Sequence, residues 1–155
     1  MIIKVIFCKY MKIIKSPEKL EYIGKAVFLA GSIEEGKAKN WQEQIIEKLK
    51  NKDITVLNPR RDTWNSDWKQ TIDNPKFREQ VEWELEALEK ADFIFMYFDP
   101  GTKSPVSLLE FGLYAKTGKV TVFCPEGFWK KGNIDVVCKK YNIKQVDNFE
   151  LDFLK

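Results

Sequence analysis

The chain has 155 residues, of which 44% are hydrophobic and 32% are charged, and its net charge is +3 at pH 7. These values are typical of a soluble globular protein, and the length predicts one domain over residues 1–155, with residues 1–10 as a candidate N-terminal extension. The weak charge without a basic block gives no support for nucleic-acid binding, and no apolar run approaches the roughly 18 residues that cross a membrane.

Strands and helices are predicted to alternate along the chain. The first 15 residues alternate loosely between apolar and polar positions and form either a strand or a hairpin arm. Later strands are predicted over residues 26–30, 54–57, 93–98, 120–124 and 144–146, and helices over residues 41–51, 75–90, 105–117 and 133–141. This alternation predicts a single doubly wound α/β domain, with a parallel sheet of about five strands and helices on both faces.

The cysteine and histidine content indicates the cellular compartment and limits which catalytic groups are available. Cys8, Cys124 and Cys138 are an odd number without CxxC spacing, and the start of the chain has no secretory signal pattern, so we expect reduced thiols in the cytoplasm. The chain has no histidine, which excludes Ser-His-Asp and Cys-His catalysis and histidine-metal sites. Carboxylates remain as acid, base and nucleophile, and we expect neither a metal nor a redox cofactor.

Glu110 is the first candidate for a catalytic group. It is the only charged residue between Pro105 and Ala115, and no cation lies three or four positions away on this predicted helix. Ionised carboxylates are rarely buried without a partner or a function. The helix follows a buried strand and a Pro/Gly loop, which places Glu110 near the carboxyl end of the sheet, where α/β proteins bind ligands.

Glu84 is a second carboxylate at a core-facing position. On a helix of about 100° per residue it falls in the apolar stripe of Phe77, Val81 and Leu88. The other acids of this helix lie on the opposite, solvated side: Glu79, Glu82, Glu86 and Glu89. A structural role stays open, in which Glu84 pairs with an arginine or a backbone amide. Two core-facing carboxylates without histidine favour glycosyl chemistry, in which one is the nucleophile and the other moves protons.

Five motifs occur in an order that points to a known family. They are Phe28-Leu-Ala-Gly-Ser-Ile33, Asn40-Trp-Gln42, Asn58-Pro-Arg-Arg61 with Trp64, Phe77-Arg-Glu-Gln-Val-Glu-Trp-Glu84, and the block from Asp92 to Gly112. Over roughly residues 11–143 they resemble the nucleoside 2-deoxyribosyltransferase-like family. The resemblance implies a flavodoxin-like (Rossmann-like) sheet and cleavage of the N-glycosidic bond of 2'-deoxynucleosides. It also implies a covalent deoxyribosyl-glutamate, from which the sugar passes to another base or to water.

The resemblance implies roles for both carboxylates. The family's nucleophile falls on Glu110, in a Glu-x-Gly-x-x-Ala pattern that reads Glu110-Phe-Gly-Leu-Tyr-Ala115. The family's acid that handles the proton of the base lies eight positions before a strand-opening Asp. In this chain those two positions are Glu84 and Asp92, so a Glu replaces an Asp and adds a methylene.

The sugar contact departs from the family pattern. Many members hold the sugar hydroxyls with an Asp six residues before the nucleophile, and this chain has Ser104 there. Ser104 or Ser107 could contact the sugar, or Asp99 could fold back toward it. Asn133 aligns loosely with a residue that members insert into the site of a neighbouring subunit, so the resemblance implies a homo-oligomer, a dimer or larger.

Two loops are candidate ligand contacts. Gly31-Ser-Ile-Glu-Glu-Gly36 lacks the GxGxxG pattern and its acids would repel a phosphate, so we interpret it as a nucleoside-contact loop that includes Ser32. Arg60 and Arg61 either bind a phosphate or anchor their loop by pairing with acids, and we favour the second. The resemblance also places Phe28 and Trp64 near the base.

The sequence thus predicts an N-glycoside transferase with small-molecule nucleosides and nucleobases as its partners. One alternative is a hydrolase of nucleoside monophosphates or NAD-like N-ribosides, which Arg60 and Arg61 would support. Another is a non-catalytic nucleotide-binding domain, in which Glu84 and Glu110 only hydrogen-bond a ligand.

Overall fold

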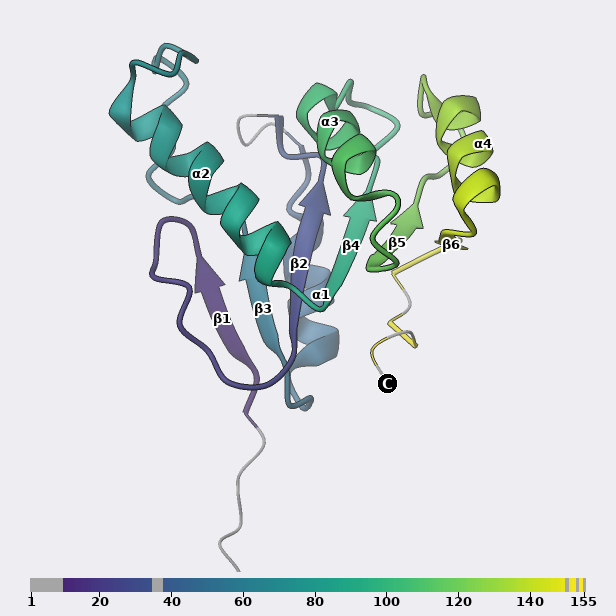
Figure 1. Ribbon diagram of the computed structural model, residues 1–155, viewed down its shortest axis with the longest axis horizontal. Helices are drawn as coiled ribbons and strands as arrows, with labels where there is room; N and C mark the ends of the chain where they lie inside the picture. Colours follow the sequence, from purple (N-terminus) through teal and green to yellow (C-terminus); the bar gives the residue numbers. More distant parts are fainter. Residues whose placement is uncertain (1–9, 35–37, 150, 153, 155) are drawn as a thin grey trace, which may run out of the picture.

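The computed structural model describes residues 10–34, 38–149, 151, 152 and 154, so the predictions for residues 1–9, Glu35 and Gly36 lie outside the described residues. These residues form one parallel sheet of six strands, in the order β1-β3-β2-β4-β5-β6 (Figure 1). The strands are β1 (Lys12–Lys15), β2 (Ala26–Gly31), β3 (Thr55–Asn58), β4 (Phe93–Tyr97), β5 (Val120–Phe123) and β6 (Lys144–Val146). The helices are α1 (Trp41–Leu49), α2 (Pro75–Lys90), α3 (Pro105–Tyr114) and α4 (Lys131–Tyr141).

The order of the sheet confirms the predicted fold class. From β2 onward the strands follow the flavodoxin-like arrangement, in which the winding direction reverses between β2 and β4. The sheet has six strands rather than about five, because β1 adds to the edge. This strand pairs in parallel with β3, with Ile13 opposite Val56, so the hairpin arm is the wrong alternative. The predicted helices and strands are otherwise present, and their ends differ by at most three residues.

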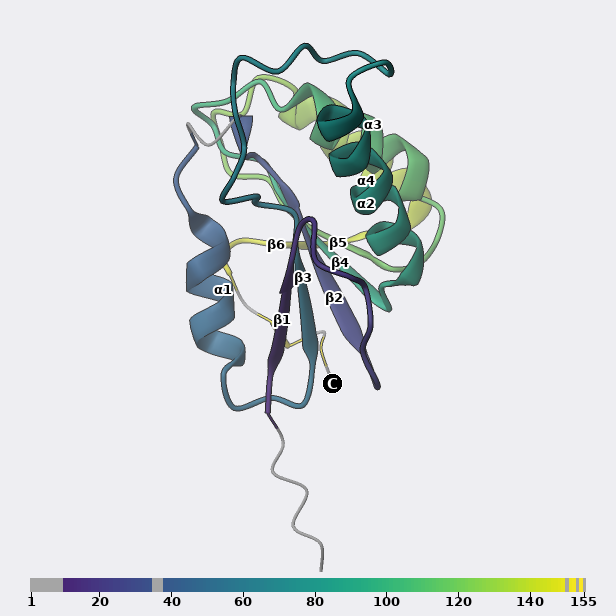
Figure 2. The ribbon, with the colours of Figure 1, turned by 90° about the vertical axis from the view of Figure 1, so that its left-hand side faces the viewer.

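Helices cover both faces of the sheet. Figure 2 shows α1 on one face and α2, α3 and α4 on the other. Along β2, Val27 and Leu29 belong to the apolar cluster that contains Trp41 of α1, whereas Phe28 belongs to the cluster on the opposite face. All six residues of β2 are buried, as expected for a parallel strand that is covered on both sides.

Gly31 permits a close approach of β2 and β4 where the two strands end. Its φ angle is +132°, and a Cβ atom built there would lie 2.1 Å from the carbonyl oxygen of Tyr97. A side chain at this position would therefore collide with the neighbouring backbone. The glycine brings the loop after β2 against the loop after β4.

Two further observations bear on predictions from composition. Cys124 and Cys138 are free and buried, while Cys8 lies outside the described residues. Within the described ranges, no helix is both long enough and apolar enough to cross a membrane.

Candidate active site

A pocket of about 790 Å³ lies beyond the carboxyl ends of β2 and β3, among the loop after β3 and helices α2 and α3. Both candidate catalytic carboxylates line it, Glu84 from α2 and Glu110 from α3. Other predicted site residues that line it are Gly31, Trp64, Ser104 and Ser107. The pocket lies at the reversal of strand order, where doubly wound sheets bind ligands, and its volume suits a small molecule.

A cluster of hydroxyl groups fixes the start of α3 and with it the position of Glu110. The side chains of Ser32, Thr102 and Ser104 are hydrogen-bonded to one another. Ser104 has a φ angle of 47°, in the left-handed region, and the helix begins at the next residue, Pro105. Glu110 lies on the buried side of this helix and is 8% exposed.

Gln80 holds the Glu84 carboxylate in place. Its Nε2 donates to Glu84 Oε1 at 2.8 Å and to the carbonyl oxygen of Pro59 at 2.8 Å, while its Oε1 accepts from the Ser16 hydroxyl. Gln80 is buried, so these bonds are shielded from water. Gln80 was not predicted from the sequence, although a glutamine four positions before a core-facing glutamate on one helix was an available signal.

Burial raises the pKa values of both carboxyl groups, and the charge of Glu84 adds to the effect at Glu110. Burial raises the pKa of Glu84 from 4.5 to about 7, and the hydrogen bond from Gln80 opposes the change. Burial, and then the charge of Glu84, raise the pKa of Glu110 well above 4.5. Coupled carboxyl groups lose their protons as a pair, so this pair retains a proton close to neutral pH. One pocket can thus hold a protonated and an ionised carboxyl group together.

Glu34 brings a third carboxylate to the pocket. Its Oε1 accepts hydrogen bonds from the backbone amides of Lys103, at 2.5 Å, and Ser104, at 3.0 Å. Glu34 also lines the pocket, and its φ angle of 44° is one that few residues other than glycine adopt. The loop was predicted to contact a nucleoside, but Glu34 was not assigned a role. Its carboxylate lies beside Ser104, the position where many family members have Asp.

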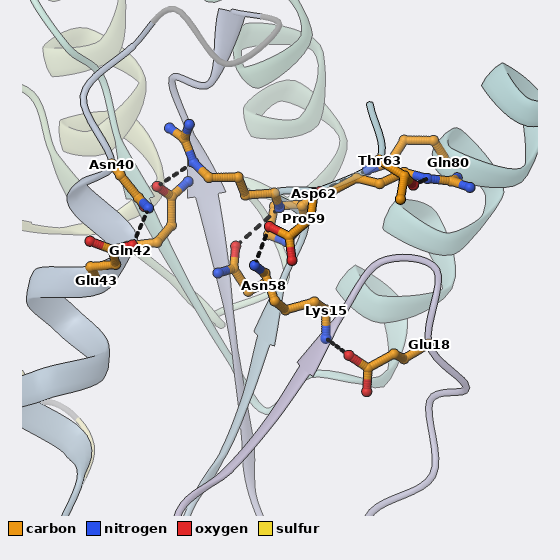
Figure 3. A network of polar contacts seen from close by, with 12 residues as sticks. Lys15, Glu18, Asn40, Gln42, Glu43, Asn58, Pro59, Asp62, Thr63 and Gln80 are labelled. Atoms are coloured by element: carbon orange, nitrogen blue, oxygen red, sulfur yellow. Dashed lines mark hydrogen bonds and ion pairs between the residues drawn. The ribbon is translucent and has the colours of Figure 1, made fainter. Parts of the chain in front are cut away.

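The loop that follows β3 is anchored at its first residues (Figure 3). Asn58 Oδ1 accepts from the Arg60 amide at 3.0 Å, and Lys15 of β1 forms a 2.5 Å ion pair with Asp62. The Arg60 guanidinium donates to Gln42 Oε1 and to backbone carbonyl oxygens of the segment before α1. These contacts agree with the loop-anchoring interpretation of Arg60.

Arg61 and Trp64 form one wall of the pocket, and Trp68 packs against both of them. Arg61 Nη2 forms a 2.8 Å ion pair with Glu79 Oε2, and its Nε donates to Thr63 Oγ1 at 3.0 Å. The bond from Arg61 is the main cause that lowers the pKa of Glu79. The guanidinium lies over the ring of Trp68 at 5.2 Å, and Trp64 meets that ring edge-on, also at 5.2 Å. Glu79, which was predicted on the solvated face of α2, is half-exposed and bound to this wall.

The remaining predicted site residues lie outside the pocket lining. Phe28 is fully buried and packs against Trp83, with ring centroids 6.4 Å apart, so this position gives no support for a base contact. Ser32 belongs to the hydroxyl cluster, and the Asp99 carboxylate accepts from an amide of its own loop at 2.8 Å instead of reaching the pocket. Asn133 is exposed on α4, and its contact with a neighbouring subunit stays a prediction.

The fold and the pocket define an α/β protein whose candidate ligand site contains two carboxyl groups with raised pKa values. A family model described as nucleoside 2-deoxyribosyltransferase like matches residues 24–128. The matched span is more than half of the chain and includes Glu84 and Glu110, and the protein belongs to this family. Among proteins of curated function, none matches the chain significantly.

Proposed function

We propose that the protein transfers 2-deoxyribose from one nucleobase to another through a covalent ester on Glu110. The observation that carries the proposal is the pair of carboxyl groups with raised pKa values in one pocket, the partly buried Glu84 and the buried Glu110. Membership of the nucleoside 2-deoxyribosyltransferase-like family supports the substrate class. Carboxylate pairs are the groups that glycosyl chemistry with a covalent intermediate requires.

Of the two carboxyl groups, Glu110 has its pKa raised further, by burial and by the charge of Glu84, so the first step begins when the proton of the pair moves from Glu110 to Glu84. The ionised carboxylate of Glu110 then attacks C1' of the sugar from the face opposite the base. The electron pair of the N-glycosidic bond leaves with the base, and Glu84 donates a proton to the departing nitrogen. Formation of the ester removes the charge of Glu110. Since the repulsion between the two carboxylates is reciprocal, this loss of charge makes it easier for Glu84 to give up its proton.

In the second step, a nitrogen of the incoming base attacks C1' and gives its proton to Glu84. The electron pair of the ester bond returns to Glu110, which becomes a carboxylate again. Two displacements at C1' restore the original configuration, so the product retains the stereochemistry of the substrate. If water replaces the base in this step, the same site hydrolyses the nucleoside.

Glu34 is proposed as the sugar contact that replaces the family's Asp. Two backbone amides at the start of α3 hold one of its oxygens, and the carboxylate lies in the lining of the same pocket as Glu110. A carboxylate accepts hydrogen bonds from sugar hydroxyls, and these bonds are stronger than those to a neutral acceptor. Ser104 and Ser107, which also line the pocket, are neutral groups that supplement this contact.

A homo-oligomer is the proposed functional unit. Along the exposed side of α3, Val106 is 57%, Leu109 is 64% and Leu113 is 57% exposed, while the single charged residue of this helix, Glu110, is buried. Exposed apolar patches of this kind mark interaction sites. Val106 also lines the pocket, so a second copy seated on this face would reach the pocket rim, where Asn133 of that copy is proposed to act.

Base exchange tests the proposed function. The protein is incubated with each of several 2'-deoxynucleosides, with and without a second free base, and the products are separated by chromatography. We expect a new nucleoside only when the acceptor base is present, and its loss in Glu110→Ala. Base release that does not depend on the acceptor would identify a hydrolase, and absence of turnover with every deoxynucleoside would contradict the proposal.

A further inference from the structure

Two buried hydrogen-bond donors on the pocket wall have no partner within the described part of the chain. They are Nη1 of Arg61 and Nε1 of Trp64, and neither atom has a hydrogen-bond partner among the residues that the structure describes. Both residues line the pocket, and the Arg61 side chain is only 4% exposed. Buried polar atoms without a partner are rare in folded proteins, and each requires an explanation. A ligand in the pocket provides one for both atoms.

The rest of the Arg61 guanidinium is already held, which fixes the direction of the free donor. Nη2 is bound to Glu79 and Nε to Thr63, and the plane lies over Trp68. The Trp64 ring is positioned against the same Trp68 ring. The two unpartnered donors therefore belong to a rigid group of side chains, and a group of this kind loses little conformational entropy when a ligand binds.

The partner of these donors must be a hydrogen-bond acceptor, because a guanidinium and an indole nitrogen only donate. The charge of Arg61 is balanced by Glu79. Among the described residues of the lining, the other two cations are also engaged, since Arg60 donates to backbone carbonyls and the Lys103 ammonium lies 4.7 Å from the Trp129 ring centroid. A phosphate would thus lack a free counter-charge, whereas an uncharged keto oxygen needs none.

We propose that Arg61 and Trp64 recognise the 4-keto oxygen of a pyrimidine or the 6-keto oxygen of a purine, so that this protein binds bases with a keto group at that position (keto bases) in preference to bases with an amino group there (amino bases). The inference rests on the proposed function, which makes a nucleobase the ligand of the pocket. It assigns base selection to the loop after β3, while Glu84 and Glu110 on α2 and α3 carry out the transfer.

Binding of free bases tests this proposal apart from catalysis, because a free base has no glycosidic bond to cleave. Calorimetric titrations of the full chain compare uracil with cytosine and hypoxanthine with adenine. We expect each keto base to bind about tenfold more tightly than its amino counterpart, as one satisfied hydrogen bond provides. Trp64→Phe, which keeps the ring but removes the donor, and Arg61→Met should each remove most of this preference.

Trp68→Phe is the matched control, since it alters the same aromatic group but retains both donors, and it should keep the preference. Thermal unfolding verifies that each variant is folded. If Arg61→Met does not fold, Trp64→Phe, the more conservative substitution, tests the proposal by itself. Equal binding of keto and amino bases by the wild type would overturn the proposal, as would variants that weaken both classes equally.

A 5'-phosphate effect provides a separate outcome. If deoxyuridine 5'-monophosphate binds more tightly than deoxyuridine and Arg61→Met removes that difference, the donors serve a phosphate and the keto proposal is wrong. If the protein prefers keto bases but turns over no deoxynucleoside, the proposed transfer reaction is wrong and this inference stands. If the protein transfers deoxyribose but shows no preference for keto bases, this inference is wrong and the proposed function stands.

Discussion

The side-chain amide of Gln80 donates one hydrogen bond to Glu84 Oε1 and another to the carbonyl oxygen of Pro59, each at 2.8 Å. The candidate proton donor on α2 is thereby tied to the loop that follows β3. Because Ser16 donates to the same glutamine, the residue after β1 is part of this connection. The added edge strand thus contributes to the position of a candidate catalytic group.

Replacement of Gln80 by Leu should move the basic limb of the pH–rate profile to higher pH. The hydrogen bond from Gln80 lowers the pKa of Glu84, so its loss raises that pKa and lets Glu84 keep its proton to higher pH. The variant should also lose about 1–3 kcal/mol of unfolding free energy, because buried partners become unsatisfied. The measurement is kcat against pH, with the exposed Glu82→Gln on the same helix as control. An unmoved basic limb would contradict the positioning role.

Replacement of Glu84 by Gln should stabilise the protein at high pH only. The folded-state pKa of about 7 lies above the ordinary value of 4.5, so the wild type loses stability as the pH rises between these values. At about pH 8, Glu84→Gln should be more stable by on the order of 3 kcal/mol, and below about pH 4 the difference should vanish. Urea unfolding measures both, and Glu89→Gln, exposed on the same helix, should show no such dependence. Equal stability of Glu84→Gln and wild type at high pH would show that Glu84 pays no burial penalty.

Replacement of Glu34 by Gln should weaken recognition of the sugar. Glutamine keeps an oxygen for the amides of Lys103 and Ser104 but removes the negative charge that strengthens bonds from hydroxyl groups. We expect kcat/KM to fall about tenfold with a normal deoxynucleoside. With analogues that lack the 3'- or 5'-hydroxyl, the loss should be smaller for the hydroxyl that Glu34 contacts. An equal loss with every analogue would mean that Glu34 only supports the start of α3.

A mixing experiment tests whether the active site is shared between copies. Asn133→Ala and Glu110→Ala should each be nearly inactive, and a mixed oligomer of the two should regain activity, because one of its sites has both intact residues. Glu110→Ala mixed with Glu84→Gln is the control, since these residues line one pocket of one chain and no complete site forms. Full activity of Asn133→Ala alone would remove Asn133 from the mechanism.

The fold was predictable because its pattern is local. Alternating short apolar runs and amphipathic segments indicate a parallel sheet with helices, and a single charge in an apolar helix indicated Glu110. The same local patterns could not show toward which face of the buried strand β2 a side chain points. Phe28 was expected near the base, whereas it lies in the core. Glu34 and Ser104 are 70 positions apart, and no sequence period connects them. Contacts of this kind depend on the tertiary fold, which also explains why the pairing of Arg61 with Glu79 was foreseen only in general terms.

The ester on Glu110 is the central claim, and mass spectrometry of the intact protein tests it most directly. The protein is mixed with a 2'-deoxynucleoside in the absence of acceptor base, quenched in acid and weighed, and the modified peptide is sequenced. The account predicts an added mass of one deoxyribosyl group on Glu110, which disappears after a chase with a second base and never forms in Glu110→Gln. Base exchange by Glu110→Gln at the wild-type rate, or an adduct on another residue, would contradict the account.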